Sequence, residues 1–153
     1  METTTEKTNP STPHVLVGVD GSPNSLKALR LGLQEATWRG IGCRALIAWT
    51  YPVMYGMEGG VYAVEPATLE TSASVALDEA IVAAFPDVAD QVKITRFTIG
   101  GPPAETLIEE SKRAALLVIG ARGHGGFMGL LLGSISSQVV KHAHCPVLVV
   151  HPD

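Results

Sequence analysis

The fold is decided by one stretch, which reads HVLVGVDGSPNSLKALRLGLQEATWRGIGCRALIAW from His14 to Trp49. Residues 14–20 and 43–49 are short apolar runs rich in β-branched side chains, as expected of buried strands. Between them Ser22 precedes a proline, which suits the start of a helix, and this helix should end near Gly40. A strand, a helix and a second strand in this order predict a parallel crossover.

The same alternation continues along the rest of the chain. Apolar residues at helical spacing predict a second helix over 69–84, and a third follows the turn at 100–103. Further strands are expected at 92–99, 115–120 and 146–151. Residues 92–99 alternate apolar and polar side chains, so this strand should lie at an edge of the sheet with one side in solvent.

A fourth helix is expected to begin at Gly133 and Ser134. Its buried stripe should be formed by Leu132, Ile135, Val139 and His142. The complete order predicts an α/β fold with one doubly wound, five-stranded parallel sheet and four helices. Residues 1–13 lack apolar periodicity and are expected to be a disordered tail, which leaves residues 14–153 as one domain.

Residues 50–66 show neither helical nor strand periodicity. Their glycines, prolines, tyrosines and methionines predict a long mobile loop. A loop of this length is either functional, as a flap over a ligand or a partner, or a merely flexible connector. The sequence leaves both interpretations open.

Composition excludes several classes of protein. The chain is 46% hydrophobic and 17% charged, which argues against disorder and favours a sheet buried on both faces. The net charge of −4, without a basic run, argues against nucleic-acid and anionic-membrane partners. Because no leader-like start and no membrane-length apolar run occurs, a cytoplasmic location is expected.

The cysteines and histidines do not predict a metal site. Cys43 and Cys145 each lie in or beside an apolar run, so both are expected to be reduced and structural. His142, His144 and Cys145 form a cluster of potential metal ligands. However, His142 is assigned to a buried helical stripe and no second cluster completes a four-ligand set, so core and helix-end roles are favoured.

The segment between Val118 and Ile135 has the composition of an anion-binding loop. Its glycines, which let backbone N–H groups converge on one point, are Gly120, Gly123, Gly125, Gly126 and Gly129. A phosphate is expected to bind the amides of Gly133, Ser134 and Ile135 at the start of the fourth helix, together with the Ser134 hydroxyl. Arg122 can add a positive charge, whereas His124 either contacts the phosphate or faces solvent.

Asp20 and the glycine loop should meet. In doubly wound sheets ligands bind beyond the carboxyl ends of the strands, where the strand order reverses. Asp20 ends the first strand and Gly120 ends the fourth, which makes them neighbours at that point. Asp20 alternatively begins an Asp-Gly turn and caps the first helix. Ser136 and Ser137 are expected either to support Ser134 or to accept a hydrogen bond from the loop, with dedicated catalysis less favoured.

Common nucleotide and hydrolase motifs are missing from the sequence. No Gly-x-x-x-x-Gly-Lys-Ser/Thr occurs, which excludes a P-loop. The nearest dinucleotide motif, at Gly123 and Gly125, has Met128 in place of its third glycine. A hydride-transfer enzyme is therefore disfavoured. The sequence also lacks the Gly-x-Ser-x-Gly elbow that would predict a serine hydrolase.

The spacing that does occur is Gly120-x-x-Gly123, nine residues, then Gly133-Ser134. It resembles the signature of the universal stress protein family in its nucleotide-binding branch. The likeness extends to residues 15–20 and 142–147, and so covers essentially the whole domain. The resemblance implies a flavodoxin-like (adenine nucleotide alpha hydrolase-like) sheet of order 3-2-1-4-5 that binds ATP, normally with Mg²⁺, and a homodimer that pairs the last strands.

The resemblance also implies a set of site residues. Those expected around adenine and ribose are Gly18, Val19, Asp20, Ala48 and Trp49. Those expected around the phosphates are Gly120, Ala121, Arg122, Gly123, Gly133, Ser134 and Ile135, with His124 in the same loop. The first hypothesis is a nucleotide-dependent regulator of the stress response. The alternatives are a dimeric adaptor with AMP or cyclic AMP as its ligand, and a slow ATPase.

Overall fold

The computed structural model describes residues 12–51, 54–55, 61–62, 64–124 and 129–153. Its centre is a five-stranded parallel sheet of order β5-β2-β1-β6-β7. The strands are β1 (His14–Gly18), β2 (Gly42–Trp49), β5 (Ile94–Gly100), β6 (Leu116–Gly120) and β7 (Val147–Val150). Counted along the chain, this order is 3-2-1-4-5, which confirms the predicted flavodoxin-like sheet and places the alternating strand β5 at an edge.

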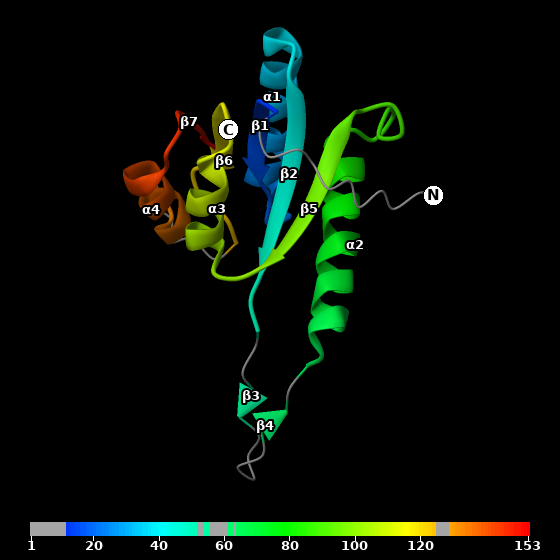
Figure 1. Ribbon diagram of the computed structural model, residues 1–153, viewed down its shortest axis with the longest axis vertical. Helices are drawn as coiled ribbons and strands as arrows, with labels where there is room; N and C mark the ends of the chain where they lie inside the picture. The colour runs from blue at the N-terminus through cyan, green and yellow to red at the C-terminus, as the bar shows by residue number, and fades with distance from the viewer. Residues whose placement is uncertain (1–11, 52–53, 56–60, 63, 125–128) are drawn as a thin grey trace.

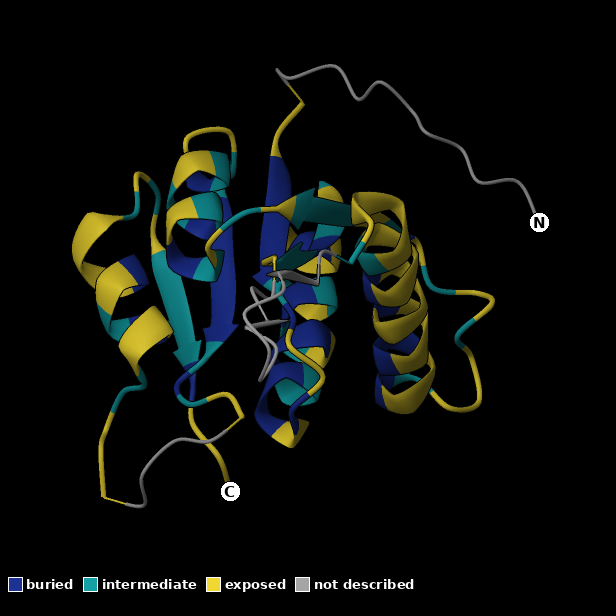
Figure 2. Cartoon of the chain, turned by 90° about the horizontal axis from the view of Figure 1, so that it is seen from below, coloured by how far each residue is buried: buried dark blue, intermediate teal, exposed yellow. Residues whose placement is uncertain are grey.

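Four helices cover the sheet (Figure 1). They are α1 (Pro23–Arg39), α2 (Pro66–Ala84), α3 (Pro103–Ser111) and α4 (Ser134–His142). Val15 and Val17 of β1 pack with α1 and α2, whereas Leu16 packs with α3 and α4, because successive side chains of a strand face opposite sides. Figure 2 shows the corresponding pattern in the helices, with buried faces toward the sheet and exposed faces outward.

The helix α1 has the predicted ends. The Ser22 side chain accepts a hydrogen bond from the Ser25 N–H, which satisfies a donor that the helix leaves free. At the other end Gly40 has a φ of 66°, a left-handed conformation that glycine adopts without steric cost. These local signals therefore placed the first crossover correctly.

The region between β2 and α2 contains a short hairpin. Strands β3 (Met54–Tyr55) and β4 (Val61–Tyr62) pair in antiparallel fashion and form a separate two-stranded sheet. Figure 1 shows this hairpin beyond the carboxyl end of β2. The prediction of a loop without regular structure over 50–66 was therefore wrong at these strands, since two residues are too few to give a strand periodicity.

The predicted buried stripe of α4 was also wrong. Val139 is fully buried, but Ile135 is 42% exposed, Leu132 is half-buried and His142 is exposed. The reason is the position of α4 beside the edge strand β7, where a helix has little sheet to cover and buries only a narrow side. Within the described ranges no helix is both long and apolar enough to cross a membrane. Most of the predicted tail, residues 1–11, lies outside these ranges.

Candidate functional site

A cavity of about 470 Å³ lies at the carboxyl ends of β1, β2 and β6. This volume is within the range of about 300–1,000 Å³ that is typical of ligand sites. The predicted site residues that line it are Gly18, Val19, Asp20, Ala48, Gly120, Arg122, Gly123, His124, Gly133, Ser134 and Ile135. The parallel strands thus bring the end of β1 and the glycine loop to one place.

Trp49 and Ala121, which were also predicted, do not line this cavity. The Ala121 side chain is fully buried, and its N–H donates to the carbonyl of Val150 at 2.8 Å. The Trp49 carbonyl accepts the N–H of Gly101 at 2.8 Å, and its ring packs on Gly100. Both residues therefore support the walls instead of facing the cavity.

Several lining residues were missed or assigned a different role from sequence. They are Ser22, Ser25, Leu46, Ile47, Ala76, Pro103, Leu107, Ile119 and Ser136. Leu46 and Ile47 directly precede Ala48 in β2, so a wider definition of the strand end would have included them. Ala76, in the middle of α2, carries no local signal, because only the tertiary packing of α2 beside β2 brings it to the cavity.

The Asp20 carboxylate connects the turn between β1 and α1 to the glycine loop by hydrogen bonds. Its Oδ1 accepts hydrogen bonds from the Ser22 N–H at 2.9 Å and from the Ser22 hydroxyl at 2.5 Å. Its Oδ2 accepts the N–H of His124 at 3.3 Å. Asp20 thus begins the turn, but the helix cap is Ser22, so the capping role considered for Asp20 was wrong. Its carboxylate also lines the cavity.

The pKa of Asp20 lies below its ordinary value. Partial burial raises this pKa, but the hydrogen bonds from Ser22 and Ser25 and the nearby His124 outweigh burial and lower it. Hydrogen bonds to a carboxylate stabilise its charged form. The cavity therefore contains a fixed negative charge beside the loop at neutral pH.

Two glycines of the loop leave no room for a side chain. A Cβ on Gly123 would overlap Oδ2 of Asp20, and a Cβ on Gly120 would lie 2.9 Å from Nδ2 of Asn24. The Nδ2 group of Asn24 also donates to the carbonyl of Arg122 at 3.2 Å. The spacing between these glycines is thus explained by close packing of the loop on the residues around α1.

The start of α4 presents backbone donors to the cavity. The Gly133 N–H donates to the carbonyl of Ala121 at 2.8 Å, so this amide, expected to bind phosphate, already has a partner. The Ser136 hydroxyl donates to the same carbonyl at 2.7 Å and is buried. The next amides, of Ser134, Ile135 and Ser136, belong to the first turn, whose N–H groups have no acceptor within the helix.

Arg122 and His124 supply the remaining polar groups of the loop. Both line the cavity, and His124 is exposed. The Nε atom of Arg122 is buried and has no hydrogen-bond partner among the residues that the structure describes. A buried donor of this kind is costly unless a ligand or water satisfies it.

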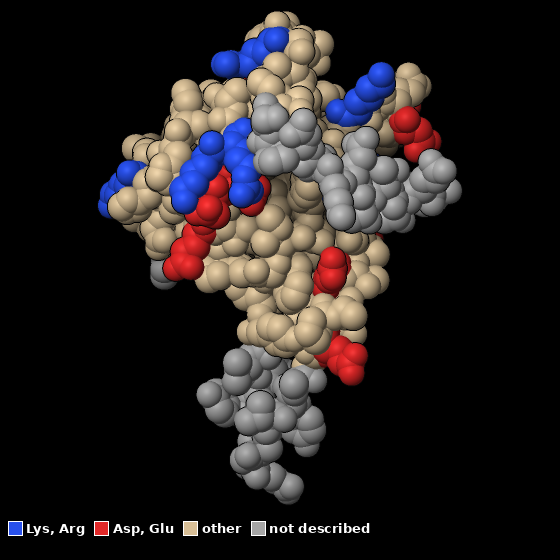
Figure 3. Space-filling view, viewed as in Figure 1, with Lys and Arg blue, Asp and Glu red and all other residues tan. Residues whose placement is uncertain are grey.

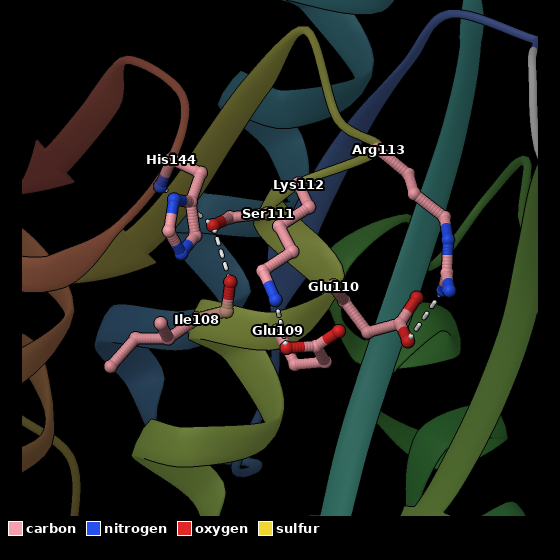
Figure 4. Close-up of polar contacts among 7 residues, drawn as sticks. All are labelled: Ile108, Glu109, Glu110, Ser111, Lys112, Arg113 and His144. Carbon is pink, nitrogen blue, oxygen red and sulfur yellow. Dashed lines mark hydrogen bonds and ion pairs between the residues drawn. The ribbon is translucent and has the colours of Figure 1, made fainter.

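The histidines near the last strand lie apart from other potential metal ligands of the described residues. In the described part of the chain no group of three or more His, Cys, Asp or Glu side chains could hold an ion. His142 and His144 are exposed, and the His144 N–H donates to the Ser111 hydroxyl at 2.9 Å. This contact is visible in Figure 4 and fixes the connection between α4 and β7.

The cavity therefore combines an apolar region with an end that carries hydrogen-bond donors and a positive charge. Val19, Leu46 and Leu107 provide apolar surface for a flat ring. The first turn of α4 provides N–H groups and the positive end of a helix dipole, and Arg122 provides a formal charge. An elongated ligand with an aromatic ring at one end and phosphate at the other matches this distribution.

Comparisons with known proteins give a consistent result. The sequence model of the universal stress protein family matches residues 12–151 of this chain. A universal stress protein from Mycolicibacterium smegmatis is 38% identical over 139 residues, covering 90% of this chain and 45% of that relative. One from Mycobacterium tuberculosis is 35% identical over 141 residues, covering 92% and 46%. The chain thus spans about half the length of the curated relatives it matches.

Solved structures with the same fold also match. A universal stress protein in complex with cAMP has 27% sequence identity and a TM-score of 0.65, with 92% of this chain and 98% of that chain covered. A universal stress protein from Lactobacillus plantarum has 24% identity and a TM-score of 0.62, with 92% and 97% covered. At 24% sequence identity, the second match shows a shared fold alone.

Proposed function

The chain belongs to the universal stress protein family, and we propose that it binds ATP and acts as a nucleotide-dependent regulator of the stress response. One observation carries the proposal. The cavity joins the end of β1, through Asp20, to Gly120, Gly123 and Gly133 and to the first-turn amides of α4, which have no acceptor within the helix. Recognition of an adenine nucleotide needs an apolar wall and a phosphate cradle in this relative position.

The phosphates are proposed to bind at the start of α4. The N–H groups of Ser134, Ile135 and Ser136 are the available donors, and the Ser134 hydroxyl lies on the same turn. Arg122 lines the cavity and supplies a positive charge near the phosphates. This assignment moves the amide contacts one residue along the helix from those expected from sequence.

The base and sugar are proposed to bind over the ends of β1 and β2. Gly18, Val19 and Ala48 line this part, and Leu46 and Leu107 add apolar surface. A Cβ on Gly18 would lie 3.1 Å from side-chain atoms of Leu107 and Ile119, so the glycine leaves space in the cavity at this point.

Magnesium fits this site as a companion of the triphosphate. Mg²⁺ prefers oxygen ligands and usually keeps several waters, so one carboxylate plus phosphate oxygens is a common arrangement. Asp20 is negatively charged and lines the cavity. It would hold the ion together with the phosphates, and the bound ion would neutralise part of the repulsion between Asp20 and the nucleotide.

Regulation by binding is proposed in preference to catalysis. The lowered pKa of Asp20 makes its carboxylate a weak base, and both its oxygens already accept hydrogen bonds. Slow ATP hydrolysis remains the alternative in the enzyme class. A phosphate-release assay on protein freed of contaminating phosphatases separates the two: turnover that disappears in the Arg122→Met variant would favour the ATPase.

AMP or cyclic AMP is the alternative ligand, because the structure of a 27% identical relative was determined with cAMP. The three ligands differ in the phosphates that reach α4. Competitive calorimetric titrations with ATP, AMP and cyclic AMP test the choice. Tightest binding of ATP supports the proposal, whereas tighter binding of cyclic AMP assigns the site to a monophosphate. A cytoplasmic location is part of the proposal, since a regulator must share a compartment with its ATP.

A homodimer through β7 is proposed as the assembly, and it is the basis of the adaptor hypothesis. The strand β7 is an edge strand, and Val140 on the neighbouring α4 is 45% exposed. The unpaired backbone of an edge strand can pair with a second copy. Sedimentation equilibrium tests it: a mass of twice 16.1 kDa supports the dimer, and a monomer at all concentrations contradicts it.

A further inference from the structure

A second cavity, of about 260 Å³, lies on the α3 side of the sheet. Its floor consists of apolar side chains from three adjacent strands, β1, β2 and β5. They are Leu16, Leu46, Phe97 and Ile99. Leu16 and Leu46 are almost fully buried, so the floor belongs to the core. The volume is below the roughly 300–1,000 Å³ of drug-sized ligand sites, which limits any occupant to a small molecule.

An arginine in the sheet lines this cavity. Cys43 and Ala45 of β2 face α1 and α2, so Arg44 between them faces the α3 side, in register with Leu16. Side chains at interior positions of a parallel sheet are usually apolar. The guanidinium of Arg44 lies 5.5 Å from the centre of the Phe97 ring, in a cation–π contact.

The charge of Arg44 is only partly compensated. Among the described residues no carboxylate forms an ion pair with it. Burial lowers the pKa of Arg44, because the guanidinium loses hydration, and the more distant Glu110 opposes this effect. A guanidinium that has lost part of its hydration can gain a charge-assisted hydrogen bond from an anion that approaches it.

The end of α3 completes the rim. Glu110 accepts a hydrogen bond from Nη1 of Arg113 at 3.2 Å, and both side chains line the cavity. Figure 4 shows this pair reaching from α3 toward the sheet, separate from the Glu109–Lys112 pair. Figure 3 shows basic and acidic side chains side by side over α3.

The rim therefore carries one net positive charge. Arg44 and Arg113 contribute two positive charges and Glu110 one negative charge. His14 also lines the cavity, but burial lowers its pKa, so its ring adds no charge at neutral pH. A singly charged anion matches this balance, whereas a phosphate dianion would meet the Glu110 carboxylate without full compensation.

We propose that this cavity binds a small organic monocarboxylate with an apolar body. Its carboxylate accepts hydrogen bonds from Arg44 and from the guanidinium nitrogens of Arg113 other than the Nη1 that contacts Glu110. Its apolar body rests on Leu46 and Ile99, beside Phe97. This inference does not depend on what the larger cavity binds.

The two cavities are separate but adjacent. Leu46 lines both, and α3 contributes Leu107 to the larger cavity and Glu110 to the smaller one, about one helical turn apart. A probe molecule must therefore be located by residue. The amides of Phe97 and Arg113 report on the smaller cavity, and those of Ser134 and Ile135 report on the larger one.

The test is a titration of the full ¹⁵N-labelled chain with benzoate, at constant pH and ionic strength, followed by amide chemical shifts. Saturable shifts centred on Phe97 and Arg113 are expected. Arg44→Met should weaken binding by at least about tenfold, because a charge-assisted hydrogen bond is lost. Methionine suits this apolar position, so the variant should keep the fold. Unchanged amide chemical shifts in α1 would verify this.

The matched control is Arg96→Met. Arg96 lies on β5 but forms an ion pair with Asp78 of α2 on the opposite side of the sheet. Its replacement should leave benzoate affinity unchanged, and neutral benzamide should bind at least about tenfold more weakly than benzoate. The proposal is overturned by shifts confined to Ser134 and Ile135, by the absence of saturation, by equal binding of benzamide or inorganic phosphate, or by an Arg44→Met variant that binds like the wild type.

Discussion

The carboxylate of Asp20 occupies the space beside Gly123 that a side chain would need. The same carboxylate accepts hydrogen bonds from Ser22 and from the N–H of His124. The end of β1 and the glycine loop are therefore in direct contact. This contact gives Gly123 a packing role in addition to its proposed role near the phosphates.

Replacing Gly123 with alanine should displace either Asp20 or the loop, because the new Cβ would overlap Oδ2. ATP affinity is expected to fall by at least about tenfold, since small displacements in a binding site weaken several contacts together. Isothermal titration calorimetry measures the change. Gly42→Ala is the control, because its Cβ would meet only the Cβ of His14, at 3.9 Å.

A double substitution tests the cause of that loss. In Asp20→Ala, Gly123→Ala the clashing carboxylate is gone, so the two losses of affinity should not add. Strict additivity in this cycle would show that Gly123 and Asp20 act independently and would reject the contact as the reason for the glycine.

Asp20→Asn should lower the melting temperature at neutral pH by about 2–4 °C, the change expected for roughly 1 kcal/mol in a chain of this size. The asparagine amide would place an N–H donor where Oδ2 of Asp20 accepts the His124 N–H, so this hydrogen bond would be lost. Because folding lowers the pKa of Asp20, its charge stabilises the fold above its unfolded pKa of about 3.9. The difference between the proteins should shrink as the pH falls below about 4. A difference that grows on acidification contradicts this assignment.

Ser136→Ala should weaken ATP binding without unfolding the protein. The Ser136 hydroxyl donates to the carbonyl of Ala121, which also accepts the Gly133 N–H, so one of two contacts joining the loop to α4 is lost. A loss of about 1 kcal/mol corresponds to roughly fivefold in affinity. Ser137→Ala, the next position in the same helix, is the control. Equal affinities for the two variants would assign Ser136 a role in packing alone.

Cys43 should resist alkylation in the folded protein. Burial raises the pKa of its thiol to about 12, so almost none of the reactive thiolate exists at pH 8. Cys145 is less buried and should react first. Mass spectrometry after iodoacetamide treatment reads the two sites. Labelling of Cys43 before Cys145 under native conditions would contradict the structure at β2.

The elements with local signals could be predicted from sequence. Ser22 and Gly40 marked the ends of α1, apolar runs gave four strands of the main sheet, and the alternating pattern at 92–99 gave β5. The helix α4 was harder, because its position beside the edge strand decides which residues are buried. His142 therefore fits a helical stripe in the sequence but is exposed in the structure.

The site was predictable where it depends on strand ends, and less so where it depends on packing. Asp20 and Gly120 follow from the rule that ligands bind at the carboxyl ends of parallel strands. The hydrogen bond from the Gly133 N–H to the Ala121 carbonyl depends on the tertiary packing of the start of α4 beside the end of β6. Similarly, Ala76 reaches the cavity only through the packing of α2. Neither the Gly133–Ala121 hydrogen bond nor the position of Ala76 can be predicted from the spacing of residues in the sequence.

The central claim is that the first turn of α4 holds the phosphates of ATP, and a calorimetric titration with MgATP of Ser134→Ala and Ser134→Pro tests it most directly. Proline is tolerated at the first position of a helix, and the extended conformation of Gly133 suits the residue before it. The alanine variant loses the hydroxyl, whereas the proline variant also loses the backbone N–H. We predict one ATP per chain in the wild type, and at least about tenfold weaker binding in the proline variant than in the alanine variant, with similar melting temperatures. Equal affinity of the two variants, or no binding by the wild type, would contradict the claim.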